Sequence, residues 1–379
     1  MKNILIISGS YPKITCGVGD YTNVLYSYLN NEVINQNYNF EILTSNKALN
    51  FNNPKIHNVI KKWSGFYIIR TILKFAKNYD IVHFEFPSVE YNSKSFAFYV
   101  LLPVLLRLKK IKVVYTFHEY SNNTKISKLV RVPAIKCSNK LIVVDTQFYN
   151  EINNKYKCKN KLYYIPIGPN IEKSTISISE IKEKRDEILN KYKVTKIISY
   201  FGFIDESKCM YETLLSFGKL KEEGKLDSML LIIGEFNQNK CNKEYYNLLV
   251  ECIEKYNLKE NILVTGYLES REVGNYFKIS DAAILLYKNG ISLRNGSMLA
   301  AYQENIPIIT SKNSQDNDFF KQKNFVLINN DITSIYNAIL DLQEGKIIPC
   351  KNNTLISWEK IAQEHIKIYE SFEDKKQMV

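Results

Sequence analysis

The chain has 379 residues, 45% of them hydrophobic, which suits two globular domains. Its seven cysteines are scattered and never form a C-x-x-C pair, and only four histidines are present, which argues against a zinc site or a disulfide framework and favours a reducing cytosol. No run reaches the roughly 18 apolar residues of a membrane span, and the first residues read as a buried strand rather than a signal peptide.

The charge of the chain is unevenly distributed. Residues 1–170 hold 23 Lys and Arg against 9 Asp and Glu, a net charge of +14, and the remainder holds 28 against 30, a net charge of −2. A composition bias of the genome should act on both halves, so it does not explain the asymmetry. The basic half indicates an anionic partner such as a membrane surface, a nucleic acid or an acidic polymer.

The first half of the chain alternates short apolar runs with amphipathic segments. The runs are rich in Val, Ile and Tyr, as strands buried on both faces of a parallel sheet are; they are NILIIS, FEILTS, DIVHFEF, KVVYTFH, KLIVVD and LYYIPI. Helical spacing of apolar residues is found over residues 20–29, 64–78 and 95–108. This alternation predicts βαβ units and a doubly wound sheet.

A polar linker after Asn170 leads into a second alternation of the same kind. Its predicted strands are KIISYFGF, SMLLIIGEF, NILVTGY, AAILLY and IPIIT, and the chain closes on the amphipathic helix SWEKIAQEHIKIYESFEDKK. The sequence therefore predicts an α/β protein with Rossmann-like domains over residues 1–170 and 171–357 and a final helix over 358–379. Ligands of such sheets bind at the carboxyl ends of the strands.

One strand-loop-helix segment, residues 287–311, is a candidate binding site for an anionic ligand. The strand AAILLY stops at Asn289 and Gly290, and Gly296 and Ser297 open a helix. A helix N-terminus presents free N–H groups and a positive dipole end, and Arg294 beside it adds a fork of donors, so a phosphate or diphosphate would fit. An ordinary strand-loop-helix with a polar turn explains the same spacing.

The order of motifs over nearly the whole chain resembles the retaining, nucleotide-sugar-dependent glycosyltransferases of the GT-B fold, particularly family 4. The resembling segments are YPKITCGVGDYTNVLYSYL, DIVHFEFP, VVYTFHEY, YYIPIGPN, YFGFIDESKCMYETLLSF, LLIIGEF, VTGYLESREVGNYFKISDAAILLY, the segment 287–311 and the final helix. The resemblance implies two Rossmann-like domains that face each other across a cleft, with the last helix crossing back to the first domain. It also implies metal-independent transfer with retention of configuration, without an enzyme nucleophile or a cofactor.

In the N-terminal domain the resemblance assigns a donor loop and an acceptor site. Gly17 and Gly19 lie in a loop that approaches the donor diphosphate, although a plain tight turn also explains them. His118, at the end of a predicted strand, matches a histidine beside the transferred sugar; the alternative is a core histidine. Glu85 and Glu119 are candidates for binding the acceptor, and Glu85 is equally well explained as a solvated strand end.

In the C-terminal domain the resemblance assigns donor binding. Lys208 matches a lysine that contacts the diphosphate, and Arg294 is expected to replace the family's arginine, because Phe203 stands at that position. Tyr267 and Leu268 fall where the nucleotide base is held, with a packing role as the alternative. The remaining predicted donor residues are Gly202, Ser292, Asn295, Gly296 and Ser297.

The chain departs from the family in its donor motif. Two glutamates separated by seven residues are usual there, and Ser292 and Ala300 stand at their positions. Glu304, one helical turn beyond Ala300, is a candidate to reach the ribose instead. The departure leaves open a catalytically silent paralogue that binds or stabilises a partner.

The favoured interpretation is a cytoplasmic glycosyltransferase of polysaccharide biosynthesis, with a glycan or lipid-linked acceptor. A sugar-nucleotide 2-epimerase fits the Gly-Val-Gly loop and the SLRNGS turn less well. Nucleic acid is not expected as a partner, because no basic-aromatic module is visible.

We also expect the N-terminal domain to bind peripherally to an anionic membrane surface, at the inner face of the membrane. Residues 61–77 place apolar side chains near one helical face with lysines around it, as interfacial helices do; the apolar ones are Trp63, Phe66, Ile69, Ile72, Leu73 and Ala76. The alternative is that this stripe packs on the sheet.

Overall fold

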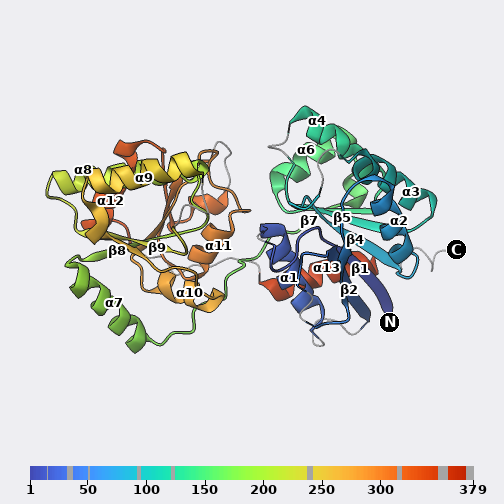
Figure 1. Cartoon of the computed structure of the whole chain (residues 1–379), viewed down its shortest axis with the longest axis horizontal. Coiled ribbons are helices and arrows are strands. Elements are labelled where there is room, and N and C mark those ends of the chain that lie inside the picture. The colour runs from blue at the N-terminus through green and yellow to red at the C-terminus, as the bar shows by residue number, and fades with distance from the viewer. Residues whose placement is uncertain are drawn as a thin grey trace. The chain divides into compact units, whose positions relative to one another are not determined.

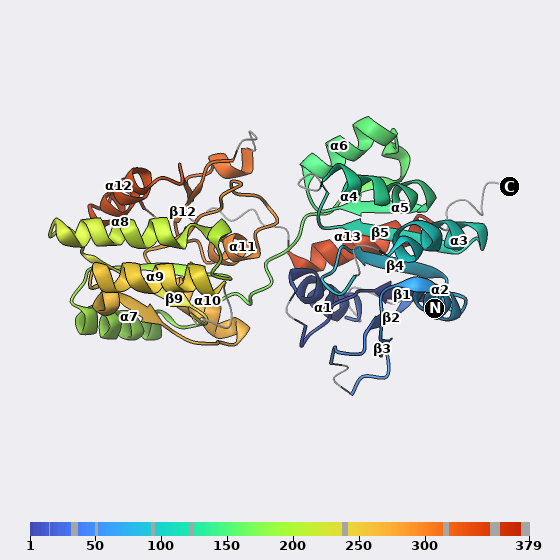
Figure 2. The ribbon, with the colours of Figure 1, turned by 45° about the horizontal axis from the view of Figure 1, so that its top comes forward.

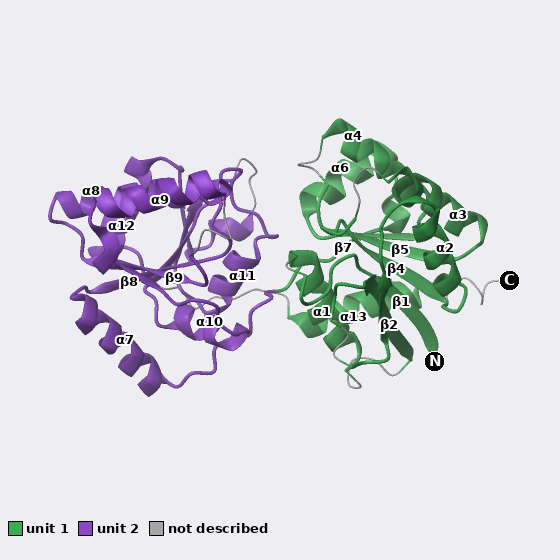
Figure 3. Cartoon of the chain, viewed as in Figure 1, with its two compact units in different colours: residues 1–168, 356–379 green, residues 169–355 purple. Residues whose placement is uncertain are grey.

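The structure is a computed structural model that describes residues 1–14, 16–31, 37–49, 52–91, 95–120, 124–236, 242–313, 318–348 and 357–372. The chain divides into two compact units (Figure 3): unit 1 comprises residues 1–168 and 356–379, and unit 2 comprises residues 169–355. Each unit has its own parallel sheet flanked by helices, so the predicted α/β class with two Rossmann-like domains is confirmed. The final helix belongs to unit 1, as the GT-B resemblance implies.

Unit 1 is built on a seven-stranded parallel sheet of order β3-β2-β1-β4-β5-β6-β7 (Figure 1). Its strands are β1 (Lys2–Ile7), β2 (Tyr38–Ser45), β3 (Ile56–Ile60), β4 (Ile81–Phe86), β5 (Lys112–Phe117), β6 (Lys140–Val143) and β7 (Leu162–Tyr164). Its helical elements are α1 (Gly17–Leu29), α2 (Gly65–Ala76), η1 (Ala97–Leu101), α3 (Leu102–Leu108), α4 (Lys125–Val130), α5 (Val132–Cys137), α6 (Thr146–Tyr156), η2 (Lys159–Lys161) and α13 (Trp358–Glu370).

Unit 2 is built on a six-stranded parallel sheet of order β10-β9-β8-β11-β12-β13. Its strands are β8 (Lys196–Phe201), β9 (Ser228–Ile233), β10 (Ile262–Val264), β11 (Ala282–Leu285), β12 (Ile308–Ser311) and β13 (Phe325–Ile328). Its helical elements are α7 (Ile178–Tyr192), η3 (Glu206–Lys208), α8 (Met210–Glu222), α9 (Lys243–Lys255), η4 (Leu258–Asn261), α10 (Ser270–Lys278), α11 (Gly296–Gln303), η5 (Asp318–Lys321) and α12 (Ile332–Gln343).

The sheet of unit 1 is buried on both faces, and neighbouring strand residues belong to different cores. Leu5 and Ile7 join the core under α2, η1, α3, α5 and α6, whereas Ile4 and Ile6 join the core under α1 and α13. Figure 2 shows these helices around the strands of the sheet. Successive side chains of a strand point to opposite faces. The unbroken apolar run of β1 is therefore the sequence of a strand covered twice, as parallel sheets require.

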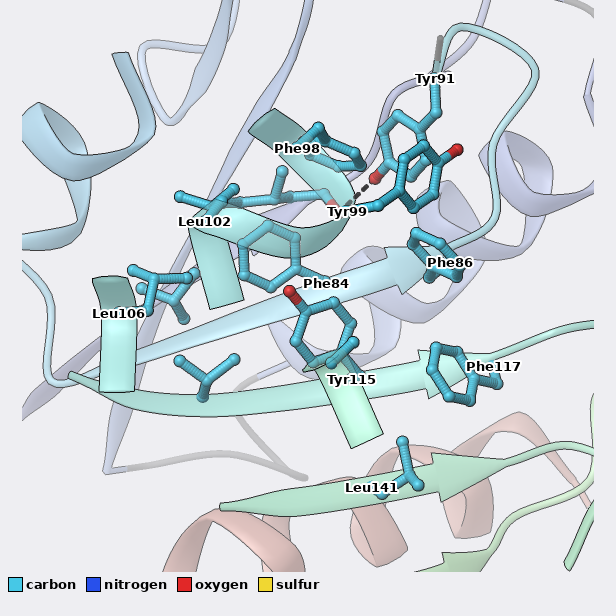
Figure 4. Close-up of a cluster of buried hydrophobic side chains, with 14 of the residues drawn as sticks. Phe84, Phe86, Tyr91, Phe98, Tyr99, Leu102, Leu106, Tyr115, Phe117 and Leu141 are labelled. Atoms are coloured by element: carbon cyan, nitrogen blue, oxygen red, sulfur yellow. Dashed lines mark hydrogen bonds between the residues drawn. The ribbon is translucent and has the colours of Figure 1, made fainter. Parts of the chain in front are cut away.

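Aromatic rings fill the core under α2 and α3. The rings of Phe84 and Tyr115, from the adjacent strands β4 and β5, stack with centroids 4.6 Å apart, and Phe98 and Tyr99 of η1 close over them (Figure 4). Because packed aromatic side chains bury large areas, this cluster fixes the positions of β4 and β5. Both strands end at the candidate active site.

The predicted membrane face of α2 is wrong for most of its residues. Ile69, Ile72 and Ala76 are buried in the core against the sheet, and so is Trp63 just before the helix. Of the predicted stripe, Phe66 alone is strongly exposed, at 79%. An apolar helical face beside an apolar sheet is buried by that sheet, which the helical spacing could not reveal.

Two strands, β3 and β13, are absent from the sequence prediction. Each is an outer edge of its sheet and pairs on one side only. The middle of β3 is only partly buried, so the segment IHNVI carries His and Asn inside a short apolar pattern. Edge strands need less apolar surface, and their pattern is correspondingly weak.

Candidate active site

The sheet of unit 2 reverses its strand order between β8 and β11. From β8 the chain proceeds outward through β9 and β10, then returns to β11 on the other side and proceeds through β12 and β13. The loops after β8 and β11 therefore leave the same edge of the sheet in opposite directions. A crevice at such a reversal is the usual ligand site of open α/β sheets.

Three predicted donor residues meet at this reversal around the ring of Tyr287. Lys208 Nζ lies 4.6 Å from the ring centroid of Tyr287, and the Tyr287 hydroxyl is 2.8 Å from Ser297 Oγ. A Cβ on Gly202 would lie 3.9 Å from that Ser297 Oγ. The site thus combines the Lys208 cation, the hydroxyls of Tyr287 and Ser297, and the glycine backbone of Gly202 near the start of α11.

Two backbone hydrogen bonds hold Tyr287 in place. Its N–H donates to Ser311 Oγ at 2.7 Å, and its carbonyl accepts from Asn330 Nδ2 at 3.0 Å. Burial lowers the pKa of Lys208, and nearby Asp205 partly opposes this. Among the ion pairs of the described residues, none joins Lys208 to a carboxylate. The lysine charge is therefore available to an anionic ligand.

A closed turn sets the start of α11. Asn295 Oδ1 accepts from the Ser292 N–H at 2.7 Å, the Asn295 N–H donates to the Ser292 carbonyl at 3.0 Å, and the Arg294 N–H donates to Ser292 Oγ at 3.3 Å. A Cβ on Gly296 would lie 3.1 Å from Asn170 Oδ1, so glycine allows this close approach. Ser292, which replaces a family glutamate, shapes the turn through its hydroxyl and backbone.

Glu304 occupies a different environment from the predicted one. It follows the last residue of α11, at the end of the helix opposite to the reversal, and only 1% of it is exposed. Its Oε1 accepts from the Ser174 N–H at 2.7 Å, and burial raises the pKa of the carboxyl. This position favours anchoring of the segment around Ser174 over contact with a ribose. Ala300 is fully buried inside the helix.

Two aromatic side chains stand exposed at the same edge of the unit 2 sheet. Phe203, which replaces the family's arginine, follows β8, and Tyr267 follows β10, two strands away. Leu268 is half-buried beside Tyr267. Exposed rings at the strand ends are able to stack on a planar base, the role predicted for Tyr267.

In unit 1 the candidate acceptor residues lie on one face of two adjacent strands. Glu85 of β4 pairs in register with Thr116 of β5, and His83 pairs with Val114. Val114 belongs to the core under α1 and α13, so His83, Glu85, Thr116 and His118 project toward those helices. The alternation of IVHFEF places His83 and Glu85 on one face of β4, so His83 is a further member of this group that the predicted site residues do not include.

A wholly buried carboxylate is the centre of this group. Glu85 Oε2 lies 2.7 Å from His118 Nε2, while Glu85 Oε1 lies 3.6 Å from His83 Nε2 and has no hydrogen-bond partner among the described residues. His83 is held by Tyr369 Oη at 2.6 Å and Thr116 Oγ1 at 2.7 Å. Despite burial, the neighbouring histidines hold the pKa of Glu85 below its ordinary value. The carboxylate is therefore charged, and the predicted solvated strand end does not describe it.

Helix α13 completes the network from the far end of the chain. Its Tyr369 bonds His83, and its His365 Nε2 lies 3.5 Å from the hydroxyl of Tyr21 in α1. The ring of Tyr21 meets His118 edge-on at 4.6 Å between centroids. Burial lowers the pKa of His83 to about 4 and also lowers the pKa of His365, so both are neutral near pH 7. Their shared burial with Glu85 depends on the return of α13.

The two loop glycines differ in their surroundings. Gly17 is the exposed first residue of α1, and no atom of the other described residues beyond its chain neighbours lies within 4 Å of where its Cβ would be. Gly19 is buried, and its Cβ would lie 3.0 Å from the backbone of Ser10 in the loop after β1. Close packing of α1 explains Gly19, and Gly17 is the one open to a ligand. Glu119 is half-buried beside His118.

The described residues include no group of three or more His, Cys, Asp or Glu side chains that could hold a metal ion. In the same residues, no helix is both long and apolar enough to span a bilayer.

Residues 181–360 match the family model described as "Glycosyl transferases group 1". This region is slightly less than half of the chain and lies almost entirely in unit 2. A comparison with curated proteins gave no match. The family match supports a glycosyltransferase domain around the site at β8 and β11.

Solved structures similar to this chain are GT-B proteins of low sequence identity. HepE of Anabaena in complex with UDP and glucose has a TM-score of 0.67 and 10% identity, covering 100% of both chains. Sucrose-phosphate synthase of Thermosynechococcus elongatus has a TM-score of 0.63 and 14% identity over 99% of this chain and 100% of that one. A UDP-N-acetylglucosamine 2-epimerase has a TM-score of 0.59 and 10% identity over 98% of each. At these identities the likeness establishes the GT-B fold.

The buried histidines predict how the stability of unit 1 depends on pH. In the unfolded chain the pKa of His83 returns to about 6.5, whereas burial lowers it to about 4 in the fold. As the pH falls from 7 to 4, His83 therefore binds a proton in the unfolded state well before it does so in the folded state. The free energy of unfolding should fall by about 3 kcal/mol from this group. The charged Glu85, whose folded pKa is also lowered, adds a loss in the same direction at lower pH.

Both tryptophans of the chain, Trp63 and Trp358, lie in unit 1, so urea unfolding followed by tryptophan fluorescence reports on that unit. The control is His83→Gln, which removes the titrating group and keeps polar atoms near Tyr369 and Thr116. The variant should lose less stability between pH 7 and pH 4 than the wild type. Equal losses in the two proteins would contradict the assignment.

Proposed function

We propose that this protein transfers a sugar from a nucleoside-diphosphate sugar to an acceptor hydroxyl, with the donor held by unit 2 and the acceptor by unit 1. The carrying observation is the meeting of Lys208, Tyr287, Ser297 and Gly202 at the strand reversal of unit 2, inside the region that matches the glycosyltransferase family. The complexes of HepE with UDP support a uridine nucleotide as the first donor to test.

On the donor side, the diphosphate would lie at the N-terminus of α11. The free N–H groups of the first turn and the Lys208 ammonium would stabilise the negative charge that develops as the nucleotide leaves. Arg294 is proposed to add its guanidinium, as the replacement for the arginine that Phe203 displaces. We propose that these fixed donors act without a metal ion, and that the anomeric configuration is retained, as the family resemblance implies.

On the acceptor side, we propose that His118 accepts the proton of the acceptor hydroxyl. Its Nε2 faces the Glu85 carboxylate at 2.7 Å, so the proton of the neutral ring resides on Nε2 and Nδ1 keeps a basic lone pair. A buried carboxylate that orients a histidine in this way is the arrangement of many general bases. Glu85 is then a positioning residue rather than an acceptor ligand, and Glu119 remains a candidate for the acceptor.

Two other functions are favoured by particular observations. The absence of the family carboxylates at Ser292 and Ala300 favours a non-catalytic paralogue, and the likeness to a sugar-nucleotide 2-epimerase favours an isomerase. A paralogue would bind nucleotide or a partner without turnover. An epimerase would change the sugar of UDP-N-acetylglucosamine without an acceptor, which product analysis distinguishes from transfer.

The first prediction of this proposal concerns Lys208. Lys208→Met should weaken UDP binding by roughly 10- to 100-fold, because a charge-assisted contact contributes about 1.5–3 kcal/mol. Isothermal titration calorimetry measures it. The matched control is Lys225→Met, a lysine of unit 2 that is paired with Glu223 and Tyr336. If Lys208→Met binds UDP as tightly as that control, the diphosphate is not held here.

The second prediction concerns the pair of Glu85 and His118. His118→Ala should lower UDP release from a reactive nucleotide sugar by roughly 100-fold, while UDP affinity stays unchanged because unit 2 is intact. Glu85→Gln should lower turnover in the same direction and shift the acidic limb of the pH–rate profile. In the Glu85→Gln variant, nitrogen-15 NMR of labelled histidine should show that the tautomer of His118 with its proton on Nε2 is less populated than in the wild type.

A purely structural role for Glu85 would instead change stability alone, with an unaltered pH profile and an unaltered His118 tautomer. Normal turnover in His118→Ala would contradict its role as the base.

A further inference from the structure

Four large apolar side chains of unit 1 are strongly exposed on helical elements that follow neighbouring strands. Phe66, Phe96, Ile126 and Leu129 are 79%, 63%, 77% and 68% exposed, and we call these four residues the apolar rim. Phe66 is the second residue of α2, Phe96 immediately precedes η1, and Ile126 and Leu129 lie in α4. Single exposed apolar residues are ordinary, but several of them on elements of one helical layer favour an interaction surface.

The topology places the rim along one edge of the unit. The elements α2, η1 and α4 each follow a strand of the parallel sheet, β3, β4 and β5 respectively, so each begins near the carboxyl edge. They lie in the same helical layer: α2 contacts η1, η1 contacts α5, and α5 contacts α4. Phe66, Phe96 and Ile126, at the starts of these elements, therefore lie near the edge at which β5 ends, one residue before His118.

The helical layer behind the rim is basic. The elements α2, η1, α3, α4 and α5 contain no Asp or Glu, and their charged residues are Arg70, Lys74, Arg107, Lys125, Lys128 and Lys136. Exposed Lys61 and Lys62 precede α2. Lys128 is paired with Glu151 of α6 at 2.6 Å, whereas Lys125 forms no ion pair with another described residue. An apolar row backed by a cationic layer complements an anionic surface that has an apolar interior.

We propose that the apolar rim inserts into the headgroup region of an anionic lipid bilayer, with Lys61, Lys62 and Lys125 against the lipid phosphates. Apolar side chains at helix ends penetrate the boundary between headgroups and acyl chains, and surrounding lysines add electrostatic attraction. The buried face of α2 has no part in this contact. The inference deepens the proposed function, because a rim at the edge of His118 brings a lipid-linked acceptor to the candidate base.

Co-sedimentation with vesicles tests the docking without donor or acceptor. The wild-type protein should bind phosphatidylglycerol vesicles at low salt, bind phosphatidylcholine vesicles at least tenfold more weakly, and lose affinity as salt rises. The double variant Phe66→Ser/Ile126→Ser should bind phosphatidylglycerol at least tenfold more weakly, and Lys61→Gln/Lys62→Gln/Lys125→Gln should show a weaker salt dependence.

Two exposed apolar residues away from the rim provide matched controls. Leu108, 72% exposed, ends α3 at the opposite edge of unit 1, and Ile178, 87% exposed, begins α7 in unit 2. Leu108→Ser and Ile178→Ser should bind vesicles as the wild type does. Thermal melts confirm that all variants are folded, and their UDP affinities test the donor site separately.

Three outcomes would overturn the proposal. One is no binding of the wild type to phosphatidylglycerol at low salt. Another is equal binding by the rim variant and the Leu108→Ser control. The third is a wild-type dimer in sedimentation velocity that the rim variant converts to a monomer while vesicle binding persists, since the rim would then cover a second copy of the chain.

Discussion

The reversal of strand order in a doubly covered parallel sheet is the constraint on which the rest of this structure depends. Parallel strands need crossover helices, and right-handed crossovers place the helices on one face until the chain reverses direction along the sheet. Both units reverse once, between β1 and β4 and between β8 and β11. At each reversal two loops leave the carboxyl edge in opposite directions, and this is where ligands of open α/β sheets usually bind.

In unit 2 this constraint selects small and polar residues at the edge. Gly202 has a φ of +139°, which residues with a side chain rarely adopt, and it lies against Ser297 at the start of α11. Lys208 reaches the same place from the loop after β8 and rests on the ring of Tyr287. Lys208 rests on an aromatic ring and forms no salt bridge with a described carboxylate, so an incoming phosphate need not displace one.

In unit 1 a buried charge, the carboxylate of Glu85, lies on β4, one of the two strands at the reversal. Removing a carboxylate from water is costly unless donors surround it, and Glu85 has a close donor in His118 with the neutral His83 beyond it. The helix α13 supplies Tyr369 to hold His83 in place. The end of the chain thereby supports the geometry of a side chain near its middle, which gives a physical reason for its return to unit 1.

The sequence predicted the architecture well because a strand covered on both faces needs an unbroken apolar run, as in NILIIS and SMLLIIGEF. It predicted less where the environment comes from distant segments. An amphipathic helix such as α2 has the same spacing of apolar residues whether its apolar stripe packs on a sheet or contacts a membrane. The adjacent sheet is the reason that the stripe of α2 is buried. Glu304 shares a helical face with Ala300, but the segment at Ser174 captures its carboxylate. The burial of Glu85 depends on α13, nearly 300 residues away in the sequence.

The proposed function requires that the strand reversal between β8 and β11 binds the diphosphate of a nucleotide. A crystal structure of the full chain soaked with UDP tests it most directly. We predict diphosphate oxygens within hydrogen-bonding distance of the Ser297 N–H, with Lys208 Nζ moved from the ring of Tyr287 toward the phosphate. UDP bound at another edge of unit 2, or at this edge with Lys208 unmoved and no phosphate at the start of α11, would contradict it.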